Sequence, residues 1–256
     1  MTQQGETSAT AAGQPRLFVA LDTADLAAAR TLAARLDRPN LGLKLGKEFF
    51  AAQGPAGVRA VAEGRPLFLD LKFHDIPNTV VGAVRAAAAL APGLLNVHAS
   101  GGPAMLRAAA AAATEGAEAA GVPRPAVLAV TVLTSLDDDD LAAVGQRPPV
   151  AAQVARLAGL AADCGLDGVV CGAGELPALR AAQGAGFRLV VPGIRPTWAA
   201  RDDQKRAMTP AEAVAAGADA IVVGRPVTGA ADPAAAAAAI LEEIAAAETP
   251  GAGGRP

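Results

Sequence analysis

Residues Pro66–Asp75 have the sequence PLFLDLKFHD, in which three charged residues close an apolar stretch. We expect a buried strand over Pro66–Leu71, and side-chain alternation along that strand points Asp70 and Lys72 to the same side. Asp75 follows in the next loop. Each unpaired charge in a low-dielectric pocket costs several kcal/mol. The run therefore indicates either a structural charge cluster or a site that acts on a charged molecule.

Similar short apolar runs recur along the chain, and each is followed by an alanine-rich stretch with helical character. Strands are expected at Leu17–Leu21, Leu41–Leu45, Pro66–Leu71, Leu94–Val97, Ala126–Thr131, Gly168–Val170, Phe187–Val191 and Ala220–Val223. Helices are expected at Leu26–Leu36, Glu48–Glu63, Thr79–Leu90, Ala104–Ala119, Val150–Cys164, Leu176–Gln183, Pro210–Ala216 and Pro233–Ala247. Continuously apolar strands are typical of a parallel sheet that is covered on both faces. The alternation predicts an α/β protein.

Eight strand–helix units in about 230 residues match the count and size of a (β/α)8 TIM barrel. A doubly wound open sheet is the alternative, although no GxGxxG motif follows the first strand. No domain-scale linker interrupts the pattern, so we expect one barrel domain over residues 16–247. Residues 1–15 and 248–256 are expected to be a disordered and a mobile tail, because small, polar and Gly/Pro residues dominate them.

Composition argues against several classes of function. The 256 residues carry a formal net charge of −3, which does not favour a nucleic-acid or membrane-surface partner. Cys164 and Cys171 match no disulfide framework or metal motif, and buried thiols are expected. No apolar run reaches the ~18 residues of a membrane span. Met1–Gln14 lacks the basic and apolar segments of a signal peptide, so a reducing cytoplasm is the expected location.

In such a barrel the site lies at the carboxyl ends of the strands. Charged and polar residues gather at those ends, namely Asp22, Lys44, Asp70, Lys72, Asp75, Asn96, His98, Thr134, Arg195 and Arg225, together with Pro192 and Gly224. Glycine and arginine residues follow the seventh and eighth strands, where these barrels often bind phosphate. Glycine lets backbone N–H groups approach phosphate oxygens, and arginine supplies a forked, permanent charge. The long polar segment Pro196–Thr209, which contains Gln204, suggests a lid that closes on a ligand.

Four motifs together resemble the bacterial branch of the orotidine 5′-phosphate decarboxylase family. They are Asp70–Val80 (DLKFHDIPNTV), Val130–Ser135 (VTVLTS), Val191–Pro196 (VPGIRP) followed by Asp203–Pro210 (DQKRAMTP), and Ile221–Thr228 (IVVGRPVT). The resemblance covers about Arg16 to Ala247, with the motifs in the family's order. Sugar-phosphate relatives share the first motif, but the four in combination are specific.

The resemblance implies conversion of orotidine 5′-monophosphate to uridine 5′-monophosphate and CO2, the last step of UMP synthesis, with no metal or organic cofactor. It also implies a homodimer in which Asp75, Ile76 and Thr79 serve the partner's site. Lys72 is assigned as the acid that protonates C6, since the neighbouring Asp70 and Asp75 favour its charged ammonium form. Asp70 would lie against the substrate carboxylate. Lys44 completes the catalytic set of Lys72, Asp70, Asp75 and Lys44. It would orient the carboxylates of this set and form a hydrogen bond with the ribose.

The remaining assignments concern substrate binding. Asp22 would accept from a ribose hydroxyl, the alternative being a helix N-cap for which Thr23 competes. Thr134 would bond the pyrimidine edge, unless it is an ordinary turn residue. The phosphate would be held near Pro192 by Arg195, Gln204, the Gly224 amide and Arg225, the last of which is otherwise a plain surface residue.

Other conspicuous residues receive structural interpretations. His74 and His98 are expected to support or pack beside the site, and Trp198 to cover the lid. The four acids of Asp137–Asp140 suggest a metal site, but a solvated helix start is the simpler interpretation.

Two other functions stay open. A Mg2+-dependent sugar-phosphate decarboxylase or synthase of the same barrel superfamily would want an acidic ligand at the position of Lys44. A nucleotide-binding barrel without catalysis would not need the intact set of Lys44, Asp70, Lys72 and Asp75.

Overall fold

The structure, a computed structural model, describes residues 15–199 and 208–248. Within these ranges, eight parallel strands pair in chain order and close into a barrel, as the sequence predicts. They are β1 (Leu17–Ala20), β2 (Leu41–Gly46), β3 (Leu67–Phe73), β4 (Leu94–His98), β5 (Ala126–Val130), β6 (Gly168–Val170), β7 (Arg188–Pro192) and β8 (Ala220–Val223). Each bound lies within two residues of the expected one.

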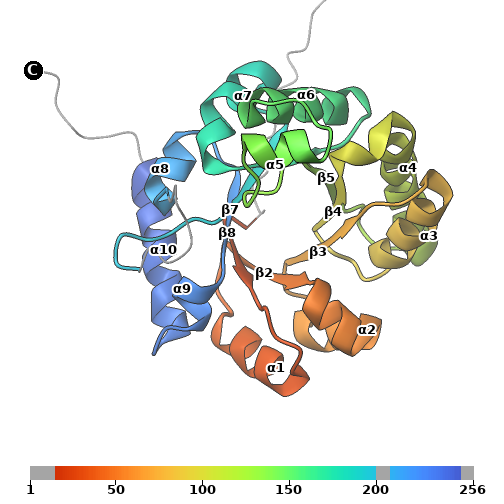
Figure 1. The fold of residues 1–256 in the computed structure, drawn as a ribbon. Helices are drawn as coiled ribbons and strands as arrows, with labels where there is room; N and C mark the ends of the chain where they lie inside the picture. Colours follow the sequence, from red (N-terminus) through yellow and green to blue (C-terminus); the bar gives the residue numbers. More distant parts are fainter. Residues whose placement is uncertain (1–14, 200–207, 249–256) are drawn as a thin grey trace, which may run out of the picture.

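The helices surround this ring of strands (Figure 1). They are α1 (Leu26–Arg35), α2 (Lys47–Ala62), α3 (Pro77–Ala88), α4 (Gly102–Ala120), α5 (Asp138–Ala143), α6 (Val150–Asp163), α7 (Leu176–Gln183), α8 (Pro210–Ala215), α9 (Arg225–Thr228) and α10 (Pro233–Glu248). Short 3-10 turns cover Ala99–Gly101 and Ala173–Glu175. Helix α9 was not expected from the sequence, which suggested only a connection between β8 and the last helix.

Two apolar layers hold the barrel together. One lies between strands and helices, and the other fills the barrel interior. In the interior, the rings of Phe18 and Phe68 meet edge to face, with centroids 5.8 Å apart. Gly42 leaves room for this pair, because a Cβ there would lie 2.5 Å from the Phe18 ring. Strands buried on both faces explain why the sequence shows continuous apolar runs.

The acidic run Asp137–Asp140 starts helix α5, as expected. The Asp137 side chain accepts from the backbone N–H groups of Asp139 and Asp140 at 3.1 and 3.0 Å. Asp140 accepts in return from the Asp137 N–H at 3.2 Å, which completes a capping box. Among the residues that the structure describes, no group of three or more His, Cys, Asp or Glu side chains is placed to hold a metal ion.

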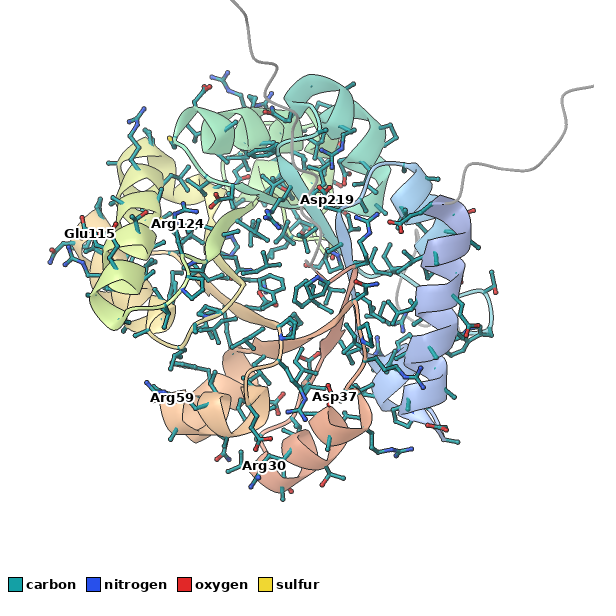
Figure 2. The ribbon with its side chains drawn as sticks, turned by 180° about the vertical axis from the view of Figure 1, so that it is seen from behind. Arg30, Asp37, Arg59, Glu115, Arg124 and Asp219 are labelled. Carbon is teal, nitrogen blue, oxygen red and sulfur yellow. The ribbon has the colours of Figure 1, made fainter. Side chains whose placement is uncertain are left out.

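Charged side chains lie on the outer surface of the ring of helices. In Figure 2, Arg30, Arg59 and Glu115 lie on the outer helices, away from the barrel interior. Both cysteines are free and buried, as expected. None of the described helices combines the length and apolarity needed to cross a membrane.

Candidate active site

Three charged side chains meet at the carboxyl ends of β2 and β3. Lys44 Nζ lies 3.1 Å from Asp70 Oδ2, and Lys72 Nζ forms a second ion pair with Asp70 Oδ1. Asp70 is 8% exposed and Lys44 is 9% exposed, so these charges are nearly withdrawn from solvent. Asp70 and Lys72 do meet on the same side, as predicted, although the backbone of β3 at Lys72 is not that of a regular strand.

Asn96 on β4 joins this cluster, although sequence analysis gave it no role. Its Nδ2 donates to Asp70 Oδ1 at 2.7 Å, and its Oδ1 accepts from the backbone N–H of Lys72 at 2.7 Å. The sequence feature that could have identified Asn96 as a site residue is its position as a single amide within the apolar run Leu94–Val97. A buried amide must have partners, and here both ends of the amide find one in the charged cluster.

Asp70 is held in its ionised form. Burial alone would raise the pKa of this carboxyl group, but the ammonium groups of Lys44 and Lys72 oppose that effect. Together with hydrogen bonds from Lys72 and Asn96, they bring the pKa below its ordinary value. The cluster therefore holds an ionised carboxylate between two lysine side chains.

Asp22 lies at the mouth of the site and does not cap a helix. Its Oδ1 accepts from Lys44 Nζ at 3.3 Å. The N-cap of α1 is Asp25, whose Oδ1 accepts from the N–H groups of Ala27 and Ala28 at 2.7 and 3.1 Å. The capping alternatives for Asp22 and Thr23 were therefore wrong, because a residue nearer the helix takes that place.

The charged cluster forms one wall of a cavity of about 210 Å3. Its other lining residues are mainly apolar, namely Phe68, Val130, Val132, Leu133, Thr134, Val170, Cys171, Pro192 and Val222. Thr134 and Pro192 thus reach the same cavity as Lys44, Asp70 and Lys72. A cavity lined by three charged side chains and mainly apolar neighbours suits a flat, polar-edged ring with an anionic substituent.

The proposed phosphate residues follow the neighbouring strands β7 and β8. Arg195 is buried, its backbone N–H bonds Met208 O at 3.1 Å, and its Nε has no hydrogen-bond partner among the described residues. Gly193 has a φ of 77°, which glycine adopts without strain. Arg225 is exposed and begins α9, with Gly224 as the preceding cap residue. Gln204 lies outside the described residues.

The residues assigned to a partner's site are exposed at the start of α3. Asp75, Ile76 and Thr79 all lie on the surface, and Ile76 is 66% exposed. Asp75 Oδ1 accepts from the Ile76 N–H at 2.6 Å, and no salt bridge joins Asp75 to Lys72 within the described chain. Asp75 therefore does not complete the charge cluster of its own subunit.

Two further titratable groups border the site. The rings of His74 and His98 lie 5.5 Å apart, and burial, His74 and nearby lysines lower the His98 pKa to about 4. His98 is therefore neutral at pH 7. Burial raises the pKa of the Cys171 thiol to about 12, so this cavity-lining group is not a nucleophile. Trp198 is half exposed in the segment after β7.

Comparisons with known proteins agree on one family. The model of the orotidine 5′-phosphate decarboxylase / HUMPS family matches residues 15–240. The curated orotidine 5′-phosphate decarboxylase of Rhodospirillum rubrum is 58% identical over 233 residues, which are 90% of this chain and 94% of that protein. That of Moorella thermoacetica is 55% identical over 232 residues, 90% of this chain and 92% of its own.

Solved structures give the same result. The crystal structure of orotidine 5′-phosphate decarboxylase from Lactobacillus acidophilus has a TM-score of 0.79 and 39% identity, and covers 90% of this chain and 99% of that chain. An uncharacterised conserved protein from Geobacillus kaustophilus has a TM-score of 0.76 and 38% identity, and covers 89% of this chain and 99% of its own.

Proposed function

Since the chain belongs to the orotidine 5′-phosphate decarboxylase family, we propose that it converts orotidine 5′-monophosphate to uridine 5′-monophosphate and CO2, the last step of UMP synthesis. The observation that carries this function is the Asp70 carboxylate, which two ammonium groups flank at a cavity that is otherwise mainly apolar. This arrangement suits a reaction that turns a bound carboxylate into neutral CO2 and leaves negative charge on carbon.

In the proposed reaction the bond between C6 and the carboxylate breaks, and its electron pair stays on C6. Lys72 Nζ then gives a proton to C6, and CO2 departs. Lys72 is a suitable donor because it is the cation nearest Asp70 and also lines the cavity. Its positive charge stabilises the developing carbanion before the proton moves.

Asp70 would lie beside the substrate carboxylate. Two like charges at close range repel each other, and this repulsion disappears as neutral CO2 forms. Lys44, at 3.1 Å from the other oxygen of Asp70, keeps that carboxylate ionised and in place. Lys44 also reaches Asp22 at the mouth, where both side chains can bond the ribose hydroxyls.

The base and the phosphate would be held at opposite ends of the site. Thr134 lines the cavity and can bond the pyrimidine edge. Buried Arg195, with an unpartnered Nε among the described residues, together with the Gly224 amide and Arg225, would bind the phosphate; Gln204 is the further candidate. Binding energy from this remote group can organise the charged set around the reacting carbon.

A homodimer would complete the site. Asp75, Ile76 and Thr79 are exposed, and no salt bridge joins Asp75 to a cation among residues 15–199 and 208–248. Packing of Ile76 against a second subunit would bury this apolar side chain and bring Asp75 to the partner's lysines. We place the working enzyme in the cytoplasm, where the pyrimidine nucleotide pool is made.

The test is the ultraviolet absorbance of purified protein mixed with orotidine 5′-monophosphate in excess EDTA. We expect conversion to the spectrum of uridine 5′-monophosphate, and loss of that conversion in Lys72→Ala. Activity that returns only with Mg2+ would point to the metal-dependent sugar-phosphate relatives. Tight binding of uridine 5′-monophosphate without turnover would indicate a binding protein.

A further inference from the structure

Asn96, a buried amide outside the proposed catalytic set, contacts two members of that set, Asp70 and Lys72. Asn96 is 1% exposed and lies on β4, next to the strand that carries Asp70 and Lys72. Its backbone is fixed from the other side by regular pairing, since Asn96 faces Leu128 in the register of β4 with β5. The side chain therefore projects from a rigid frame.

The pairing of β3 with β4 is irregular at this point. Leu69 pairs with Leu95, but the next registered pair is Phe73 with Val97. Three residues of β3 therefore stand opposite Asn96 alone, which makes an irregular bulge. Within the bulge, Lys72 has a φ of 50°, a left-handed conformation that a lysine rarely adopts.

The Asn96 side chain supplies the contacts that the bulge removes from the ladder. Its Oδ1 accepts a hydrogen bond from the backbone N–H of Lys72, and its Nδ2 donates one to Asp70 Oδ1, both at 2.7 Å. An amide suits both contacts, because it offers one acceptor and one donor. A carboxylate would place negative charge beside Asp70, and an apolar side chain would leave a backbone N–H unpaired in a buried position.

We propose that Asn96 is a positioning residue, which holds the left-handed turn at Lys72 and the Asp70 carboxylate so that both face the reacting carbon. This inference rests on the proposed decarboxylation. Asn96 does not line the cavity, so it acts through Asp70 and Lys72 and not through the substrate. Bulges next to active sites commonly re-aim a side chain in this way.

The first experiment compares Asn96→Ala with the wild-type protein and with Asp167→Ala. Asp167 makes a side-chain contact of the same length, since its Oδ2 accepts from the Val127 N–H at 2.7 Å, at the start of β5. We expect kcat to fall on the order of 10²-fold in Asn96→Ala, the usual effect of a displacement of about 1 Å at a reacting group. Affinity for uridine 5′-monophosphate should stay unchanged, because that ligand lacks the carboxylate. Asp167→Ala should lose thermal stability and keep its kcat.

The second experiment uses Asn96→Asp, which keeps the size of the side chain and the acceptor for Lys72. The new carboxyl group would lie against Asp70 and the backbone of Lys72 on β3, and Asp70 in turn pairs with Lys44 on β2. His98, two residues further along β4, shares its side of that strand, while β5 contributes only apolar residues. When protonated it can still donate to Asp70, and when ionised it repels Asp70. The kcat of this variant relative to wild type should therefore fall as pH rises, at pH values where a thermal melt shows that the variant is still folded. A purely structural defect would instead lower kcat only where the melt shows unfolding.

Three results would overturn the inference. The first is a wild-type kcat in Asn96→Ala, and the second is an equal loss of kcat in Asp167→Ala. The third is a loss of nucleotide affinity in Asn96→Asp that matches its loss of kcat, with no dependence on pH. An inactive wild-type protein would instead refute the proposed function itself, and the inference with it.

Discussion

Replacement of Lys72 by alanine tests the proposed chemistry most directly. The side chain is 25% exposed, pairs with Asp70 and lines the cavity. In the proposed reaction, its removal takes away both a proton donor and a positive charge beside the reacting carbon. The substitution leaves Asp70 with Lys44 at 3.1 Å and Asn96 at 2.7 Å, so the buried carboxylate keeps two partners.

These partners set the expected magnitudes. Leaving a buried charge uncompensated costs 3–5 kcal/mol, but here the loss should be only about 1–2 kcal/mol because compensation is partial. For a chain of this size that corresponds to a fall in Tm of roughly 2–8 °C. A general acid contributes about 10²–10⁴-fold, and a well-placed charge adds roughly 10²-fold or more. We therefore expect kcat to fall by at least about 10⁴-fold with a nearly intact fold.

The assay combines stopped-flow or manual ultraviolet kinetics with a thermal melt of the same sample. Lys72→Arg is the matched control, because arginine keeps the positive charge but holds its proton too tightly to donate it. We expect this variant to fall short of wild type by roughly the general-acid factor of 10²–10⁴. A Lys72→Ala protein that retains kcat within about tenfold of wild type would refute Lys72 as the donor, since general-acid loss alone exceeds that factor.

Three further predictions concern the phosphate, the pH response and the barrel. Arg225→Ala should raise KM for orotidine 5′-monophosphate roughly 10–100-fold, as expected for the loss of a charged hydrogen bond. The KM for unphosphorylated orotidine should change far less. Equal effects on both substrates in steady-state kinetics would remove Arg225 from the phosphate site. The pKa of His98 is about 4 in the folded chain and 6.5 in the unfolded chain, so at pH values between these two the unfolded chain binds more protons. The contribution of His98 to folding stability is therefore fully present above pH 6.5 and is lost as the pH falls toward 4. Melting curves of His98→Gln should show a flatter decline over that range, and parallel curves would contradict the assignment. Gly168→Ala should lower the free energy of unfolding by about 1–3 kcal/mol in denaturant titrations, because a Cβ there would lie 2.2 Å from the backbone oxygen of Arg188. An unchanged midpoint would show that β6 and β7 can move apart at little energetic cost.

The strands were predictable because the barrel buries them on both faces. Most residues of such strands are therefore apolar, with polar residues near the carboxyl ends, and local sequence shows that property without knowledge of the partner strands. Helix α9 was harder to predict, since its four residues follow a strand directly and include a proline. Its start depends on the backbone of Gly224, with φ −108° and ψ −105°, which no local pattern indicates.

Capping at α1 shows the limit of local reasoning at the site. Asp22, Thr23 and Asp25 are all plausible caps within four residues. Asp25 is the N-cap of α1, and Asp22 instead accepts a hydrogen bond from Lys44, a residue of the next strand. Only the pairing of β1 with β2 brings those two side chains together.

The sequence by itself determined the order of strands and helices, the barrel class and the charged residues at the strand ends, because periodicity and residue type are local properties. The tertiary structure alone decided that Asn96 faces a bulge in β3, that Lys72 takes a left-handed conformation and that the Asp75 carboxylate bonds the Ile76 N–H. Register between strands and the direction of a side chain at an irregular position depend on contacts between residues distant in the chain. Such contacts exist only once the barrel has closed.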